Sequence, residues 1–178
     1  MKTKRDGHQL IFTRQMTWPQ FERMFPDEDA CRNYLFSRRW PKGVICPRCG
    51  KRETVYKIAL PWKWECWNPD CASGHAYRFS LIAGTMFENT KYPLRIWFWV
   101  IFLIVTSKKG INALQIHRTI GSGSYGTAFY MCHRLRAALN DPEFRRLMGI
   151  EKVDETCIVE SARNRRANKK HHKTRMAG

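Results

Sequence analysis

Two cysteines separated by two residues, in the stretch Cys46-Pro47-Arg48-Cys49-Gly50, place the strongest constraint on how this chain folds. The proline and the glycine make the turn tight, and two thiolates at this spacing can fill two corners of a metal tetrahedron. Two more cysteines follow after a segment rich in strand-forming residues. This order predicts a zinc ribbon whose ligands are Cys46, Cys49, Cys66 and Cys71.

The fourth ligand has an alternative. The spacing from Cys66 to Cys71 is wider than the usual two-residue spacer, and His75 is close enough in sequence to replace Cys71. A set of reduced core cysteines is a further alternative, but the proline- and glycine-containing turn argues against it. A disulfide is disfavoured, because the basic start of the chain is followed by no apolar signal segment.

The ribbon needs three strands, and the sequence predicts them at residues 54–58, 62–66 and 77–80. The first two flank a turn at Pro61, and the third brings two aromatic side chains to one face. Gly84 and Thr85 end the third strand. Upstream, residues 1–16 are basic with little periodicity and are expected to form a loose arm.

Two short helices are expected before the ribbon. Thr17 and Gln20 have capping-box spacing, and an apolar face follows at Trp18, Phe21, Met24 and Phe25. After Pro26, the acidic residues 27–29 favour the start of a second helix, because they oppose its dipole. Cys31 falls on the apolar face of this second helix and is expected to lie in the core.

The charge balance points to a polyanionic partner. The chain has 32 basic and 15 acidic residues, a net charge of +17 and a pI near 10.0. Nucleic acid is the most common partner of such a chain, and an anionic membrane surface is the competing one. The apolar run 96–105 is too short to span a bilayer, which takes about 20 residues. We expect a buried helix over 94–106, and a reducing cytoplasm as the location.

A helix-turn-helix is predicted next. Residues 111–119 form a short amphipathic helix, residues 121–123 the turn, and 125–139 the longer helix, with Ser124 as its cap. If the longer helix reads DNA, its outer face enters the major groove. A plain three-helix bundle with a solvated face is the alternative. The candidate DNA-binding residues are Ser124, Tyr125, Thr127, Tyr130 and Arg134.

The last part of the chain changes character. Residues 150–158 alternate like a strand and place Asp154 and Glu155 on opposite faces. From Arg163 the composition is basic and cannot bury a core, so we expect it to be disordered without a polyanion. The expected organisation is a basic arm (1–16), helical lead-in and zinc ribbon (17–92), helix-turn-helix region (93–142) and a final part (143–178).

Several of these stretches together resemble the bacterial ISXO-type insertion-sequence transposases. They are the Cys46–Gly50 turn, Gly84 to Leu94, Thr106 to Ile111, Thr127-Ala128-Phe129, His133 to Arg136 and Val153-Asp154-Glu155-Thr156. Their order and spacing match over roughly residues 17–170. The resemblance implies a zinc ribbon, a helix-turn-helix and the first strand of an RNase H-like catalytic domain, in a small multi-domain protein of the α+β class.

The resemblance also implies an activity, namely metal-dependent strand transfer at the terminal inverted repeats of the element. Asp154 matches the first catalytic acid, which with later acids would hold two magnesium ions. Because the chain stops at Gly178, we expect a truncated transposase that binds double-stranded DNA and structural zinc but is inactive alone. The alternatives are a regulator that self-associates or pairs with full-length transposase, and a non-functional relic.

Overall fold

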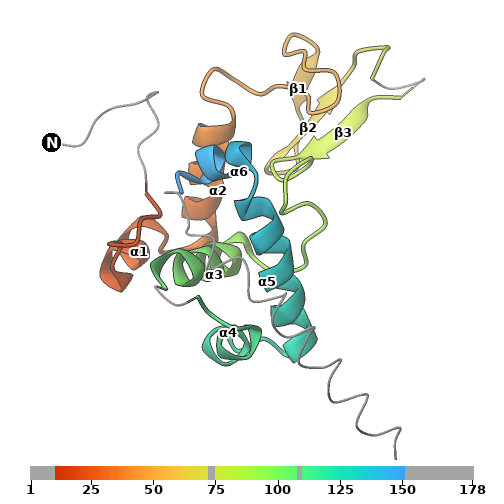
Figure 1. The fold of residues 1–178 in the computed structure, drawn as a ribbon. Helices are drawn as coiled ribbons and strands as arrows, with labels where there is room; N and C mark the ends of the chain where they lie inside the picture. Colours follow the sequence, from red (N-terminus) through yellow and green to blue (C-terminus); the bar gives the residue numbers. More distant parts are fainter. Residues whose placement is uncertain (1–10, 72–74, 108–109, 151–178) are drawn as a thin grey trace, which may run out of the picture. The chain divides into compact units, whose positions relative to one another are not determined.

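The computed structural model describes residues 11–71, 75–107 and 110–150 (Figure 1). The chain divides into two compact units, Trp18–Phe98 on the one hand and Met1–Thr17 with Trp99–Gly178 on the other. Helices and a small antiparallel sheet are both present, which confirms the α+β class. Among the residues described, no helix combines the length and the apolar character needed to cross a bilayer.

The Trp18–Phe98 unit begins with α1 (Trp18–Met24) and α2 (Glu28–Arg39). Asp27 caps α2 by accepting a hydrogen bond from the Ala30 backbone at 2.7 Å, which is the role its position favours. Phe21 and Phe25 are buried as expected. Trp18 and Met24, assigned to the same apolar face, are instead 41% and 40% exposed, because α1 is only seven residues long and buries a narrow stripe.

The sheet has the order β1-β2-β3 and is antiparallel throughout (Figure 1). Its strands are β1 (Val55–Lys57), β2 (Lys63–Cys66) and β3 (Tyr77–Ser80). Trp64 pairs with Phe79 across β2 and β3, and their rings stack at 6.2 Å. Trp40 and Phe36, from the end of α2, contact Trp64 at 5.1 and 5.9 Å. An aromatic cluster therefore joins α2 to the sheet.

Two charged side chains of α2 bind backbone groups far away in sequence. The Arg39 guanidinium donates to the carbonyl oxygens of Leu81 and Ala83, and its burial lowers the pKa of Arg39. Glu28 accepts hydrogen bonds from the backbone N–H groups of Leu94 and Arg95, both at 3.0 Å. These two N–H groups begin α3 (Leu94–Thr106), so Glu28 acts as its cap.

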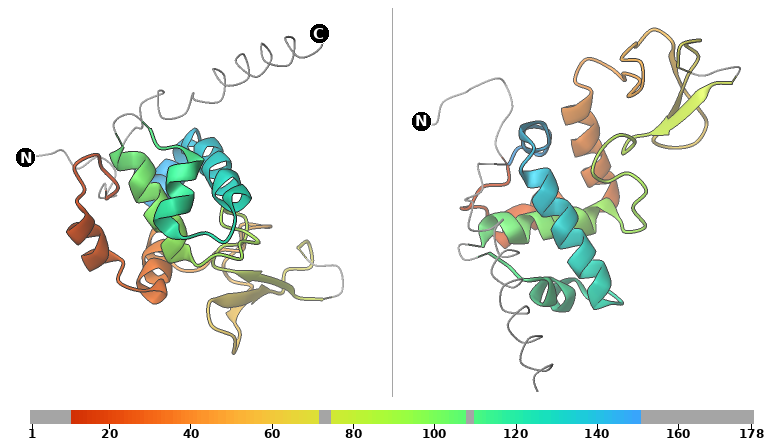
Figure 2. Two further views of the ribbon diagram at one scale, coloured as in Figure 1. Left: turned by 90° about the horizontal axis from the view of Figure 1, so that it is seen from below. Right: turned by 45° about the vertical axis from the view of Figure 1, so that its right-hand side comes forward.

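The second unit contains α4 (Ala113–Ile120), α5 (Tyr125–Leu139) and α6 (Pro142–Met148). Figure 2 shows α4 beside the first turns of α5 and α6 beside its last turns. The apolar face that helical periodicity gives α5 is buried, and it consists of Ala128, Met131, Cys132, Leu135 and Leu139. The α6 helix was not expected, although Asp141 caps it, Pro142 opens it and Gly149 ends it with a positive φ of 64°.

Residues 11–16 do not form the loose arm that we expected. Phe12 is fully buried, and Met16 is 8% exposed. The backbone N–H groups of Ile11 and Phe12 both donate to the Gly149 carbonyl, at 2.8 and 3.1 Å. Phe12 also forms a parallel bridge with Ile150. Burial of this large aromatic side chain outweighs the basic character of the surrounding sequence. The rest of the predicted arm, residues 1–10, lies outside the residues that the structure describes.

Candidate zinc site and nucleic-acid interface

The four predicted cysteine ligands come together in the Trp18–Phe98 unit. All four sulfur atoms lie within 4.8 Å of one another. The Cys46 and Cys71 sulfurs are 3.5 Å apart, and those of Cys49 and Cys66 are 3.7 Å apart. A zinc ion with Zn–S bonds of about 2.3 Å separates the corners of its tetrahedron by about 3.8 Å. The cluster therefore has the dimensions of a four-thiolate zinc site, and the distances are far too long for disulfides.

Local backbone geometry produces the first half of this cluster. Gly50 has a φ of 71°, which favours glycine, and its N–H donates to the Cys46 carbonyl at 2.9 Å. The Cys46 N–H donates to the Lys51 carbonyl at 3.0 Å and completes the turn. Cys46 and Cys49 are thereby held on one side of a short loop, as the Cys-Pro-x-Cys-Gly pattern predicts.

The second half is held by Asn68 and Arg48. The Cys71 N–H donates to the Asn68 carbonyl at 2.9 Å, and Arg48 donates to the Cys71 carbonyl at 3.0 Å. Arg48 also lies over the Tyr77 ring, 4.1 Å from its centre. His75 is exposed and is not among the clustered ligands. The structure therefore favours Cys71 over His75 as the fourth ligand.

The buried side-chain amide of Asn68 is suited to donate a hydrogen bond to a metal-bound thiolate. Asn68 is 3% exposed, and its Nδ2 makes no hydrogen bond of ordinary geometry within the described chain. The same side chain lowers the pKa of the Cys49 thiol to about 6, assisted by the Lys51 backbone N–H. Burial raises the pKa of Cys71 to about 12. A metal ion that takes up these thiolates would displace the Cys71 proton and give the Asn68 amide a charged acceptor.

The remaining described cysteines have no such setting. Burial raises the pKa of Cys31 to about 12, with the nearby Glu28 carboxylate adding to the effect. Burial also raises the pKa of Cys132. Both are fully buried in helices and keep their thiols protonated at neutral pH. They are core residues, as their helical spacing indicates.

The segment predicted as a helix-turn-helix contains two helices, α4 and α5, joined by a short turn. Gly121 leaves α4 with a φ of 62°, and the Ser124 side chain accepts from the Thr127 N–H at 3.4 Å to start α5. Ser122 is buried, and its hydroxyl lies 2.7 Å from His117 Nδ1 and donates to the Ser124 carbonyl. The turn is therefore fixed by hydrogen bonds to the helices on either side of it.

Ser124 is the N-cap of α5, and the other four predicted DNA-binding residues divide between two flanks of the helix. Arg134 donates to the Tyr130 hydroxyl at 3.1 Å, and its guanidinium lies 5.8 Å from that ring centre. Thr127 belongs to the same flank by its helical spacing. Tyr125 instead contacts Phe129, with the ring centres 6.0 Å apart, and Phe129 contacts His133 at 4.2 Å. The sequence prediction did not place Phe129 and His133 on a face with Tyr125, although the successive spacing of four residues could have indicated this aromatic stripe.

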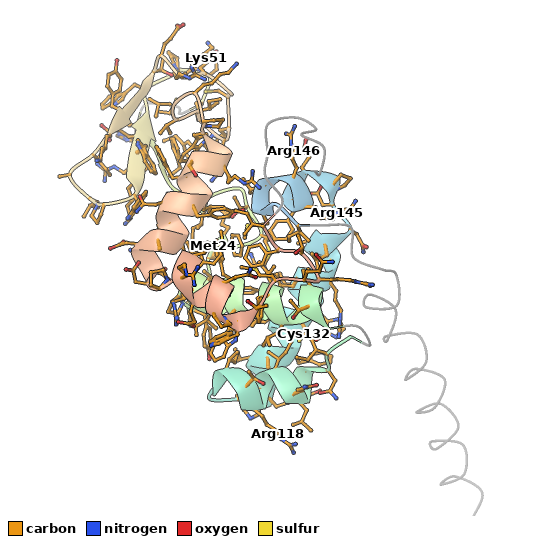
Figure 3. The ribbon with its side chains drawn as sticks, turned by 90° about the vertical axis from the view of Figure 1, so that its left-hand side faces the viewer. Met24, Lys51, Arg118, Cys132, Arg145 and Arg146 are labelled. Atoms are coloured by element: carbon orange, nitrogen blue, oxygen red, sulfur yellow. The ribbon has the colours of Figure 1, made fainter. Side chains whose placement is uncertain are left out.

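Exposed arginines lie on the helices before and after α5. Arg118 on α4 and Arg146 on α6 are exposed and point away from their helices (Figure 3). Arg136, half-buried, donates to the Ile111 carbonyl at 2.8 Å and so supports the helix pair. Asp154, the predicted catalytic acid, and the strand expected over 150–158 lie outside the described residues, apart from Ile150.

Comparison with known proteins agrees with the zinc prediction. Residues 26–73 match the family model of the transposase zinc-ribbon domain named for IS1595, and this range contains the four clustered cysteines. The chain is also 26% identical over 145 residues to an uncharacterized protein in transposable element ISH50 of Halobacterium salinarum. That alignment covers 79% of this chain and 45% of the relative, so the chain spans about half the relative's length. No solved structure matches. The family match and the relative both support a relationship to insertion-sequence transposases.

Proposed function

We propose that this chain binds duplex DNA as the recognition part of an insertion-sequence transposase. The observation that carries the proposal is the α4–turn–α5 segment, in which a short capped helix, a hydrogen-bonded turn and a longer capped helix follow one another. The net charge of +17 favours a polyanion as the partner. A zinc-ribbon match of the transposase type adds support from an independent part of the chain.

Zinc in this proposal is structural. Cys46, Cys49, Cys66 and Cys71 would fill all four corners of its coordination sphere, which leaves no open position for a substrate. The strands around the site contain only three or four residues each. A sheet of this size gains little from its own core, whereas structural zinc contributes roughly 10–16 kcal/mol of apparent binding free energy. The bound ion would therefore hold the ribbon together.

DNA contact in this proposal comes from α5 and from the exposed arginines near it. The N-terminal part of a recognition helix reads base edges in the major groove, while arginines on flanking elements bind phosphates. Tyr130 and Arg134 present a hydroxyl and a guanidinium on one flank of α5. Arg118 and Arg146 are exposed on the helices before and after it. Tyr130 and Arg134 are therefore suited to contact base edges, and Arg118 and Arg146 to bind phosphates on either side.

The proposed target is the pair of terminal inverted repeats of the element that encodes the chain. The relative's origin in a transposable element and the resemblance to the ISXO type support this target. Strand transfer with two magnesium ions is a further prediction, and the acid assigned to it, Asp154, belongs to residues that the structure does not describe. The test below therefore measures recognition alone.

The experiment uses zinc-loaded protein with labelled duplexes taken from the DNA on either side of its gene, and shuffled duplexes of the same composition. We expect tighter binding to the end sequences and a slope of about −0.9 in log affinity against log salt for each phosphate neutralised. Arg134→Ala should reduce the preference for the end sequences. Arg23→Ala removes an exposed arginine of α1 and serves as the matched control. Affinity that is insensitive to salt, or equal losses in both variants, would refute the proposal.

A further inference from the structure

A pocket of about 520 Å³ lies within the Trp18–Phe98 unit. It is lined by residues 61–63 at the start of β2, by 80–82 at the end of β3 and just after it, by 90–94, and by Glu28 and Arg32 of α2. None of these residues belongs to the cysteine cluster or to the helix-turn-helix. Its volume is within the range of small-ligand sites, roughly 300–1,000 Å³. Neither the zinc site nor the proposed recognition helix accounts for this pocket.

Aromatic and apolar side chains form much of the pocket wall. Trp62 and Tyr92 line it and are half-buried, while Leu81 and Leu94 are buried beneath. Trp62 has a φ of 58°, which is unfavourable for a bulky side chain and is tolerated only where surrounding contacts impose it. Its carbonyl accepts from the Leu81 N–H at 3.0 Å, and its ring packs edge-on against Phe36 at 6.1 Å. The Trp62 ring is therefore held in place at the pocket.

The charges around the pocket favour an anion. Lys63 and Lys91 line it, are exposed, and form no ion pair with any other described residue. Arg32 also lines it but is paired with Glu28 and Asp29, both at 3.3 Å. Glu28 is the carboxylate of the pocket, and its two oxygens are already bound by the first N–H groups of α3. Two unpaired lysines thus remain for a ligand.

We propose that this pocket accepts an unpaired nucleotide of the bound DNA, with its base against Trp62 and Tyr92 and its phosphate on Lys63 and Lys91. The inference rests on the DNA binding proposed above and adds a second point of contact to it. A base inside a duplex is paired and stacked, so it cannot enter a concave site. A base at a frayed end, an overhang or a gap can do so. Stacking on an aromatic ring tolerates any base, so the pocket recognises the unpaired state rather than the sequence.

The experiment compares a blunt duplex with the same duplex carrying a three-nucleotide thymidine overhang, using zinc-loaded protein. We expect the overhang to tighten binding about fivefold or more, the effect of one stacked base. The double variant Lys63→Glu/Lys91→Glu should lose this preference. Lys42→Glu/Lys57→Glu makes the same change of net charge at exposed lysines outside the pocket, and it should keep the preference.

A second variant tests the aromatic wall. Trp62→Gly removes the ring but suits the positive φ, so the turn itself is relieved of strain. We expect it to lose the overhang preference while retaining zinc and binding to the blunt duplex. If Trp62→Gly also disturbs the aromatic cluster, the double lysine variant still tests the pocket. Both lysines are exposed, so their replacement should leave the packing of the unit intact.

The outcomes separate the two proposals. Equal affinity of the unaltered protein for blunt and overhang duplexes would overturn the pocket assignment and leave duplex recognition standing. Failure to bind the blunt duplex, with oligothymidine still bound and sensitive to Trp62→Gly, would refute the proposed function instead. Displacement of the overhang duplex by polyglutamate as effectively as by oligothymidine of equal charge would also overturn the assignment, since it would show a site for anionic chains in general.

Discussion

Replacement of Glu28 by alanine should destabilise the Trp18–Phe98 unit more than its position on a helix surface suggests. Pro93 precedes α3 and offers no side-chain acceptor for the first N–H groups of that helix. Glu28 supplies both acceptors from α2, with one oxygen 3.0 Å from the Leu94 nitrogen and the other 3.0 Å from the Arg95 nitrogen. The substitution leaves two helix-terminal donors without their partner and removes a negative charge from the positive end of α3.

The magnitude follows from these two bonds. A hydrogen bond to a charged group contributes about 1.5–3 kcal/mol, so two of them set an upper limit of about 6 kcal/mol. The Glu28 side chain is 28% exposed, so water can reach the freed N–H groups and replace part of the lost bonding. We therefore expect a loss of about 2–3 kcal/mol in the free energy of unfolding, with the first turn of α3 fraying.

The assay is urea unfolding of zinc-loaded protein, followed by tryptophan fluorescence. Asp29→Ala is the matched control, because it removes the neighbouring acid in the same helical turn. Asp29 is 71% exposed and, within the described part of the chain, pairs with Arg32 at 3.3 Å, an interaction worth about 0.2–1 kcal/mol. The denaturant slope should remain unchanged in both variants. If the two variants lose the same stability, the capping argument is wrong.

Three further predictions concern the zinc site, the turn before α5 and the first turn of α5. Cys71→Ser should lose its zinc to a mild chelator while His75→Ala retains one ion per chain, as measured by metal analysis; the reverse result would make His75 the fourth ligand. Gly121→Ala should destabilise the protein by about 1 kcal/mol, because alanine is strained at a φ of 62°. Gly126→Ala should stabilise it by up to about 1 kcal/mol, because the new methyl group meets only Ser124 Oγ at 3.4 Å. Thermal unfolding measures the effects of both glycine substitutions, and a destabilised Gly126→Ala would contradict the last expectation.

Elements whose signals are local in sequence could be predicted well. The strand expected over 77–80 and the helix expected over 94–106 have those bounds in the structure. The Cys46–Cys49 turn and the proline directly before α3 are each contained within a few residues, so the local sequence carries the information. The buried face of α5 also follows from local sequence, because apolar residues on one side of a helix recur every three to four positions.

Contacts between distant residues could not be predicted. Phe12 and Ile150 form their bridge across most of the chain, and nothing within residues 1–16 indicates the partner. The Glu28 cap of α3 spans 66 residues, and the two groups become neighbours only once α2 and α3 have packed. The pocket at Trp62 has the same origin, since it needs four separate segments to meet. Single-sequence patterns describe faces of elements but not which faces pack together.

If α5 enters the major groove as proposed, the structure limits which of its residues can contact the bases together. A helix in the major groove presents one flank to the base edges, so residues on opposite flanks cannot all read bases. Tyr130 and Arg134 are already joined by a hydrogen bond, and Thr127 shares their flank by its spacing. Tyr125 lies on the opposite flank, in the aromatic stripe that continues through Phe129. The Phe129 ring offers no hydrogen-bond donor or acceptor. The Ser124 oxygen is engaged at the start of α5, which leaves its hydroxyl proton to donate. Base reading should therefore depend on Thr127, Tyr130 and Arg134, with Ser124 suited to a phosphate.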